Sequence, residues 1–186
     1  MQNHEPPPEF SRIVKADAVQ RGEVVEAIEA VEAERAALAA RFELEAIDRL
    51  KATLRLTPAR GGEMVRVVGE LEADVVQTCV VTLEPVRSTV KEQFESLFAP
   101  PDLVPEYDDE MEFDASMADE EIIEPMPSGR IDIGELTAQH LSLALDPYPR
   151  CPGVELPEAA VEDEEEEVVE RPNPFAALQR LKGTPQ

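Results

Sequence analysis

The strongest constraint on the fold is a change from helical to alternating periodicity near residue 50. Apolar and polar side chains alternate strictly over 51–56 (KATLRL), which is typical of a strand with one polar face. The residues TPARGG at 57–62 favour a turn, and alternation resumes over 65–74. Two alternating runs joined by a short, glycine-containing turn predict an antiparallel β-hairpin.

The segments after this hairpin continue the strand pattern. Gly69, in the middle of the second run, predicts a bulge or bend. The apolar run at 74–83 (DVVQTCVVTL) then predicts a central strand, with Cys79 on it or at its end. After a turn at Glu84 and Pro85, residues 86–98 fit either a strand or a helix, and we favour the strand.

Helical periodicity flanks these strands on both sides. Residues 23–50 are rich in Ala, Glu, Leu and Arg, with apolar residues at helical intervals, and predict one or two helices. A short first strand is expected at 10–14, and a helix near 134–145 is expected to end at Asp146 and Pro147. The fold class predicted is therefore α+β, with an N-terminal helical segment on an antiparallel sheet from about 50 to 98, closed by the C-terminal helix.

Charge divides the chain into a domain and acidic segments. The net charge is −24, and residues 99–125 hold 11 acidic and no basic residues, so like-charge repulsion predicts a disordered acidic loop inserted in a domain at 10–153. Residues 1–9 are expected to be a flexible lead and 154–186 an acidic tail. Within that tail, NPFAALQRLK predicts a short amphipathic helix at 174–182. The apolar residues of this helix are candidates for docking on a partner: Phe175, Leu178 and Leu181.

The same features exclude several cellular settings. No apolar run approaches the roughly 20 residues that cross a bilayer, and the opening MQNHEPPPEF does not resemble a secretory leader. Two cysteines are too few for a disulfide framework, which favours the reducing cytoplasm. We therefore expect a cytoplasmic protein with no membrane contact.

One basic cluster stands out against the acidic background. Residues 49–66 contain a single acid, Glu63, and their cations are candidates for contact with phosphate or RNA: Arg49, Lys51, Arg55, Arg60 and Arg66. An ordinary solvated sheet face explains the cluster equally well. No aromatic residue interleaves it, so base stacking on single-stranded RNA is not indicated.

The chemistry-bearing residues do not form a recognisable catalytic or metal motif. Neither Cys79 nor Cys151 has the second cysteine of a C-x-x-C pair, and the histidines are His4 in the lead and His140 on the expected helix. The acidic runs lack the glycine-punctuated spacing of a calcium loop. We expect no metal, no cofactor, no small-molecule substrate and no enzymatic activity.

The segment ADVVQTCVVTLEPV at 73–86 resembles the YceD family, the large ribosomal RNA subunit accumulation proteins, in particular its alphaproteobacterial branch. Three further stretches agree: ERAALAARF at 34–42, residues 131–153 ending in DPYPRCPG, and NPFAALQRLK at 173–182. The residues that carry the resemblance are Gln77, Cys79, Thr82, Leu83, Glu84, Pro85, Pro147, Tyr148, Pro149, Arg150 and Cys151.

This resemblance implies a bacterial or plastid factor, without catalytic activity, for accumulation or processing of 23S ribosomal RNA. Many members carry a C-x-x-C pair at 79–82 and a second pair near Cys151. This chain keeps one cysteine of each pair, so metal binding is not carried over. The sequence leaves open whether Cys79 and Cys151 are neighbours as relics of that site. The partner would be the pre-ribosomal large subunit.

Two modes of contact with that partner remain open. The basic hairpin would bind ribosomal RNA, whereas the acidic loops would bind a basic ribosomal protein, and the net charge of −24 favours the second. The alternatives to a ribosomal role are an acidic protein-interaction adaptor unrelated to ribosomes and a metal-binding module with a degenerate site.

Overall fold

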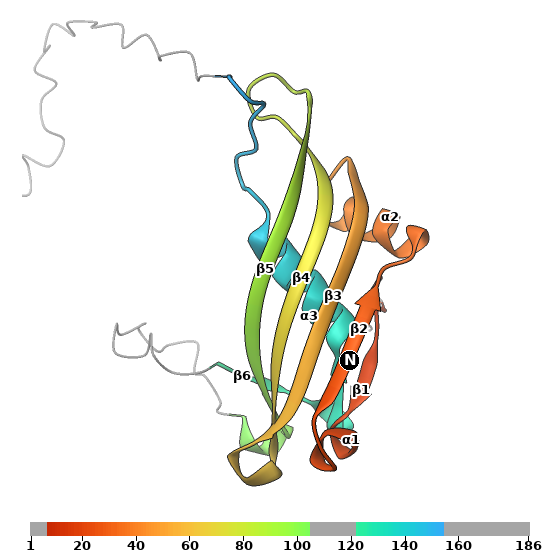
Figure 1. The fold of residues 1–186 in the computed structure, drawn as a ribbon, viewed down its shortest axis with the longest axis vertical. Coiled ribbons are helices and arrows are strands. Elements are labelled where there is room, and N and C mark those ends of the chain that lie inside the picture. The colour runs from red at the N-terminus through yellow and green to blue at the C-terminus, as the bar shows by residue number, and fades with distance from the viewer. Residues whose placement is uncertain (1–6, 105–121, 155–186) are drawn as a thin grey trace, which may run out of the picture. The chain divides into compact units, whose positions relative to one another are not determined.

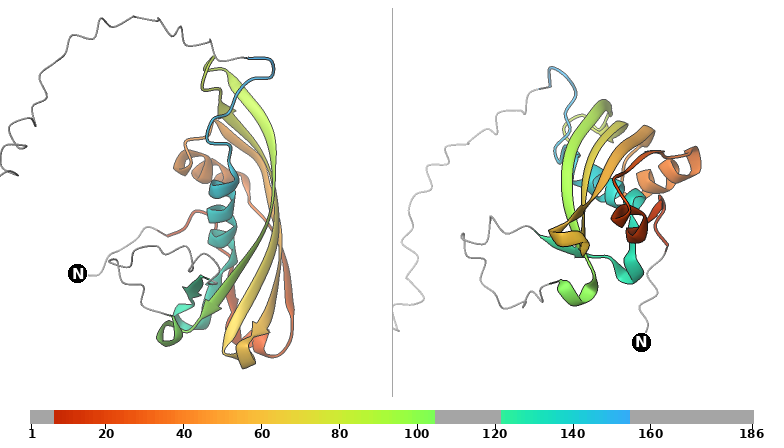
Figure 2. Two further views of the ribbon diagram at one scale, coloured as in Figure 1. Left: turned by 90° about the vertical axis from the view of Figure 1, so that its left-hand side faces the viewer. Right: turned by 60° about the horizontal axis from the view of Figure 1, so that its bottom comes forward.

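The computed structural model describes residues 7–104 and 122–154, which form an α+β unit with a curled sheet around helix α3 (Figures 1 and 2). The strands are β1 (Ile13–Lys15), β2 (Val24–Glu29), β3 (Ala46–Ala59), β4 (Met64–Thr78), β5 (Pro85–Ala99), β6 (Ile123–Pro125) and β7 (Arg130–Asp132). The helices are α1 (Ala16–Gln20), α2 (Glu32–Arg41) and α3 (Ile133–Ala144). None of the helices in these two ranges has the length and apolar character needed to span a bilayer.

The main sheet is mixed, with the strand order β2-β3-β4-β5-β6. Neighbouring strands are antiparallel, except that β6 runs parallel to the end of β5 at 97–99. Strands β1 and β7 form a separate antiparallel pair. The expected acidic loop at 99–125 is therefore wrong at its end, where Ile123 is buried beside Leu97 and β6 extends the sheet; residues 105–121 and the expected tail helix lie outside the described residues.

The hairpin of β3 and β4 is confirmed and is longer than the alternating runs indicate. Its pairing extends from Ala59 and Met64 at the turn to Ala46 and Val76. Leu50, Leu54 and Leu56 point to the concave side and are completely buried. Burial of one such side chain stabilises a fold by about 1.5–3 kcal/mol, so this row is a substantial part of what holds the sheet to the core.

Helix α3 lies along the concave face of the sheet (Figure 2). Asp132 caps its N-terminus by accepting the N–H groups of Gly134 at 3.1 Å and Glu135 at 3.2 Å. Leu136 and Leu141 of this helix are buried among the strands. The helix predicted near 134–145 is thus confirmed, and it provides the second layer that the sheet needs.

Gly69 marks a close contact and not the bulge expected from the sequence. It pairs in regular register with Leu54 on β3 and Phe94 on β5. A Cβ atom at this position would lie 2.3 Å from Cζ of Phe94, whose ring stacks on His140 of α3 with centroids 3.9 Å apart. Glycine is needed here because the Phe94 ring occupies the place of a side chain.

The N-terminal helical segment expected at 23–50 is wrong over much of its length. Only α2 is helical, whereas residues 24–29 form β2 and β3 begins at Ala46. The register of β3 shifts between Ile47 and Arg49, so Ile47 and Leu50 are both buried three residues apart. This irregularity imitates helical spacing, because a bulge adds one residue to the two-residue period of a strand.

The remaining strand predictions are mostly confirmed. The first strand is β1, shifted toward the C-terminus of the expected 10–14, and residues 86–98 form β5, the strand that we favoured over a helix. The central strand predicted at 74–83 ends at Thr78, and Cys79 begins the turn to β5. Leu97 and Phe98 are both buried because each face of the sheet is covered at this end.

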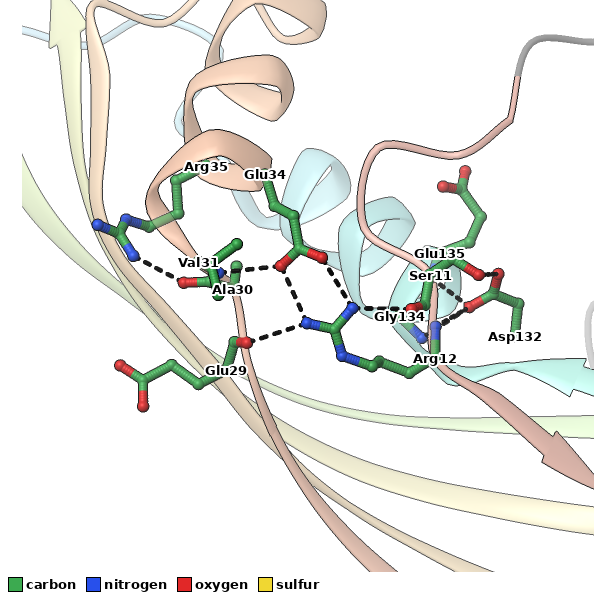
Figure 3. A network of polar contacts seen from close by, with 10 residues as sticks. All are labelled: Ser11, Arg12, Glu29, Ala30, Val31, Glu34, Arg35, Asp132, Gly134 and Glu135. Atoms are coloured by element: carbon green, nitrogen blue, oxygen red, sulfur yellow. Dashed lines mark hydrogen bonds and ion pairs between the residues drawn. The ribbon is translucent and has the colours of Figure 1, made fainter.

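A polar network around Arg12 ties the N-terminal segment to both larger helices (Figure 3). The guanidinium of Arg12 donates to both carboxylate oxygens of Glu34 on α2, at 2.8 and 3.0 Å, and its backbone N–H donates to Asp132 at 2.8 Å. Glu34 also accepts the N–H of Val31 at 2.9 Å. The hydrogen bond from Arg12 lowers the pKa of Glu34. The network thereby joins both α2 and the start of α3 to the N-terminal segment that contains Arg12.

Candidate functional site

A tight turn at 79–84 joins β4 to β5 and is built around the sulfur of Cys79. The N–H of Cys79 donates to the carbonyl oxygen of Glu84 at 2.8 Å, and the N–H of Leu83 donates to the carbonyl oxygen of Cys79 at 3.0 Å. The buried Cys79 Sγ accepts the N–H of Thr82 at 3.4 Å. The backbone therefore folds around this sulfur.

The chain that follows α3 returns to this turn. Gln77 Nε2 donates to the carbonyl oxygen of Asp146 at 2.8 Å, and the N–H of Val80 donates to that of Pro149 at 2.9 Å. The N–H of Cys151 donates to Cys79 Sγ at 3.3 Å, across 72 residues of sequence. The two stretches that carry the family resemblance, 77–85 and 147–151, thus meet in one site, which we call the cysteine turn (77–85 with 146–151).

The donors around Cys79 favour its charged form. The Thr82 hydroxyl, the N–H of Thr82 and the N–H of Cys151 lower the pKa of Cys79 to about 6, although burial opposes this shift. Cys151 is partly exposed, its Sγ lies 3.5 Å from Thr82 Oγ1, and both thiols are free. The cysteine turn therefore holds a buried cysteine of lowered pKa beside a second, more accessible thiol.

A structural zinc ion needs four cysteine or histidine ligands, whereas the described residues of the cysteine turn supply two, Cys79 and Cys151. Across the described part of the chain, no three His, Cys, Asp or Glu side chains are placed to hold a metal ion. A nucleophilic cysteine would need a nearby base such as histidine. His140 of α3 instead stacks on Phe94, and burial lowers its pKa.

Three large apolar side chains are exposed on the cysteine turn, and the sequence analysis did not single them out as a surface. Val80 is 46% exposed, Tyr148 69% and Leu83 77%. Leu83 also has a left-handed backbone with φ of 61°, which is unfavourable for a bulky residue. The run VVTLEP could have indicated this apolar tip (Val80, Leu83 and Tyr148), because such residues are unusual in an exposed turn.

Four of the five cations of the basic cluster pair with carboxylates on the same sheet or directly beside it. Arg49 donates to Asp74 at 2.9 Å and to Glu72 at 3.0 Å, and Lys51 lies 2.8 Å from Glu72. Two further ion pairs of the cluster join Arg55 to Glu23 at 2.6 Å, and Arg66 to Glu95. The fifth cation, Arg60, lies in the turn between β3 and β4.

This pairing follows from the strand register. Arg49 lies opposite Asp74, and Lys51 opposite Glu72, on the solvent face of the β3–β4 pair. The hydrogen bond from Lys51 lowers the pKa of Glu72, and those from Thr89 and Arg49 lower the pKa of Asp74. The local positive charge that the sequence suggests is therefore compensated within the sheet. The docking candidates Phe175, Leu178 and Leu181 lie outside the described residues.

The comparisons with known proteins agree with the resemblance seen in the sequence. The family model described as "Large ribosomal RNA subunit accumulation protein YceD" matches residues 67–182. The comparisons with curated proteins and with solved structures returned no match. The matched range includes the whole cysteine turn and more than half of the chain. The chain therefore belongs to the YceD family of large ribosomal RNA subunit accumulation proteins.

Proposed function

We propose that this protein is a non-enzymatic, cytoplasmic factor that supports accumulation or processing of 23S ribosomal RNA on the pre-ribosomal large subunit. Membership of the YceD family supports the ribosomal role. The cysteine turn is a rigid surface of backbone hydrogen bonds with apolar side chains exposed on it. Such a surface fits binding of a macromolecule better than turnover of a small molecule.

The pairing of the basic hairpin favours a protein as the direct contact. RNA binding gains its affinity from cations that replace the counterions of phosphates. Arg49, Lys51, Arg55 and Arg66 already have carboxylate partners, each of which a phosphate would have to displace. In contrast, residues 105–121 contain nine acidic and no basic residues, which complements a basic ribosomal protein.

Two variants of the full chain distinguish the protein mode from the RNA mode. In the first, the nine acidic residues of 105–121 are replaced by Asn and Gln at unchanged length, so that β6 is kept. In the second, Arg55→Gln and Arg66→Gln remove two cations of the hairpin. Exposed ion pairs contribute about 0–1 kcal/mol each, so the second variant should fold, which circular dichroism checks.

Each variant is expressed in a deletion strain of the host and followed by sedimentation on a ribosome gradient. The protein mode predicts that the acid-neutralised variant leaves the large-subunit precursor fractions while the Arg-to-Gln variant stays with them. The reverse pattern would contradict the protein mode and support RNA contact. If the wild-type protein stays at the top of the gradient, the ribosomal role itself fails, and the adaptor role through Phe175, Leu178 and Leu181 takes its place.

A further inference from the structure

The two cysteines of the cysteine turn form a site that the proposed function does not use. We propose that Cys79 and Cys151 are a site of oxidative modification, at which an oxidant of the peroxide class converts the two thiols into an intramolecular disulfide. This inference is independent of the ribosomal role, because it rests on the arrangement of the two residues alone.

The backbone already places the two residues within reach of each other. Cys79 Sγ lies 3.3 Å from the backbone nitrogen of Cys151, and the Cα atom of Cys151 is only one N–Cα bond, about 1.46 Å, beyond that nitrogen. Both sulfurs also contact Thr82, at 3.4 Å through its N–H and at 3.5 Å through its hydroxyl. A disulfide requires Cα atoms within about 4.4–6.8 Å of each other, and these contacts fit a separation of that order, with the Cys151 side chain rotating toward Cys79.

The surrounding hydrogen bonds keep this arrangement in place. Val80, directly after Cys79, is bonded to Pro149, and Gln77 is bonded to the carbonyl of Asp146. These contacts hold the turn and the returning chain together on both sides of Cys79 and directly before Cys151. The two thiols therefore stay close without a covalent bond, and the disulfide would join two segments that hydrogen bonds already hold together.

The difference in exposure sets the order of the chemical steps. Cys151 is partly exposed, whereas Cys79 is buried, so peroxide meets the Cys151 sulfur first. The sulfur of the Cys151 thiol attacks one peroxide oxygen and gives up its proton, the O–O bond breaks, and the released hydroxide takes up that proton to become water, which leaves a sulfenic acid on Cys151.

Cys79 then completes the reaction. Its thiolate, which the neighbouring donors stabilise, attacks the sulfur of the Cys151 sulfenic acid; the S–S bond forms, the S–O bond breaks, and hydroxide leaves and is protonated to water. In total the two thiols lose two electrons and two protons, and one hydrogen peroxide is reduced to two waters. The product joins the turn between β4 and β5 covalently to the chain that follows α3.

The test uses the full-length wild-type chain, so it does not depend on the folding of a variant. The protein is treated with a small molar excess of hydrogen peroxide near pH 7, unfolded in N-ethylmaleimide, and analysed by mass spectrometry. We expect that neither cysteine reacts with N-ethylmaleimide and that the intact mass falls by two hydrogen atoms. A peptide containing Cys79 linked to Cys151 should appear. Dithiothreitol should restore both thiols.

Other products would overturn the inference. These are Cys151 sulfinic acid with Cys79 still free, disulfide-linked dimers of the chain, and two thiols that remain fully alkylated. The Cys151→Ser variant is the matched control, because its single buried thiol at Cys79 should remain available to N-ethylmaleimide after the same treatment and unfolding.

Discussion

Substitution of Gly69 by alanine should destabilise the domain where α3 packs on the sheet. The new Cβ would lie 2.3, 2.6 and 2.8 Å from Cζ, Cε2 and Cε1 of Phe94, whereas carbon atoms pack favourably at about 3.5–4.0 Å. The Phe94 ring would have to move by about 1 Å. It is only 6% exposed and stacks on His140 at an interplanar angle of 11°, so this movement disturbs α3 as well.

The expected size follows from two opposing effects. Overpacking of a core costs about 1–3 kcal/mol, and the large overlap places Gly69→Ala at the upper end of that range. Alanine also lowers the conformational entropy of the unfolded chain, which stabilises the folded state by about 0.5–1 kcal/mol. The net loss should be about 2 kcal/mol in the free energy of unfolding, which corresponds to a Tm lower by about 5 °C for a domain of this size.

Urea unfolding measures this loss as a lower midpoint at an unchanged m-value. The Phe94→Leu variant provides the control, because leucine has no atoms at the Cε and Cζ positions. In that background Gly69→Ala should be neutral or stabilising, which gives a coupling free energy of about 2–3 kcal/mol. A neutral Gly69→Ala in the wild-type chain, or an equal loss in both backgrounds, would refute the packing argument.

Three further predictions follow from single contacts. Glu34→Gln should lower the free energy of unfolding by about 1 kcal/mol, measured by urea unfolding near pH 7. The difference from the wild-type chain should shrink as the pH falls through the lowered pKa of Glu34, because protonation then removes the charge of the wild-type carboxylate as well. Burial lowers the pKa of His140 from 6.5. As the pH falls, its imidazole is therefore protonated in the unfolded chain before it is protonated in the folded chain, and the free energy of unfolding should decrease below pH 6.5. An NMR titration that gives a pKa of 6.5 or more would contradict this. Thr82→Val should raise the pKa of Cys79 from about 6 toward 9.0, measured by thiolate absorbance; an unchanged pKa would show that the hydroxyl is not the main donor.

Local patterns predicted the hairpin and the last helix because the periodicity of each of these elements is visible within a short stretch of sequence. Strict alternation marks β3 and β4, and the helical spacing before Asp146 and Pro147 marks α3. Strand β2 and the beginning of β3 could not be recognised this way. The bulge between Ile47 and Arg49 gives the beginning of β3 helical spacing, and only pairing across the sheet identifies β2 as a strand.

The candidate site shows the same limit. The resemblance left open whether Cys79 and Cys151 are neighbours, because the hydrogen bond that joins them connects residues 72 positions apart. The basic hairpin was recognised as a cluster, whereas its neutralisation by Glu72 and Asp74 depends on the register of β4 against β3. Long-range pairing of this kind leaves no local signal in the sequence.

The central claim concerns the large ribosomal RNA, so the most direct measurement is the ratio of 23S to 16S ribosomal RNA in a deletion strain of the host. Our account predicts that this ratio falls in the deletion strain and recovers when the wild-type protein is expressed from a plasmid. An unchanged ratio in the deletion strain, with normal precursor processing, would contradict a role in accumulation of the large-subunit RNA.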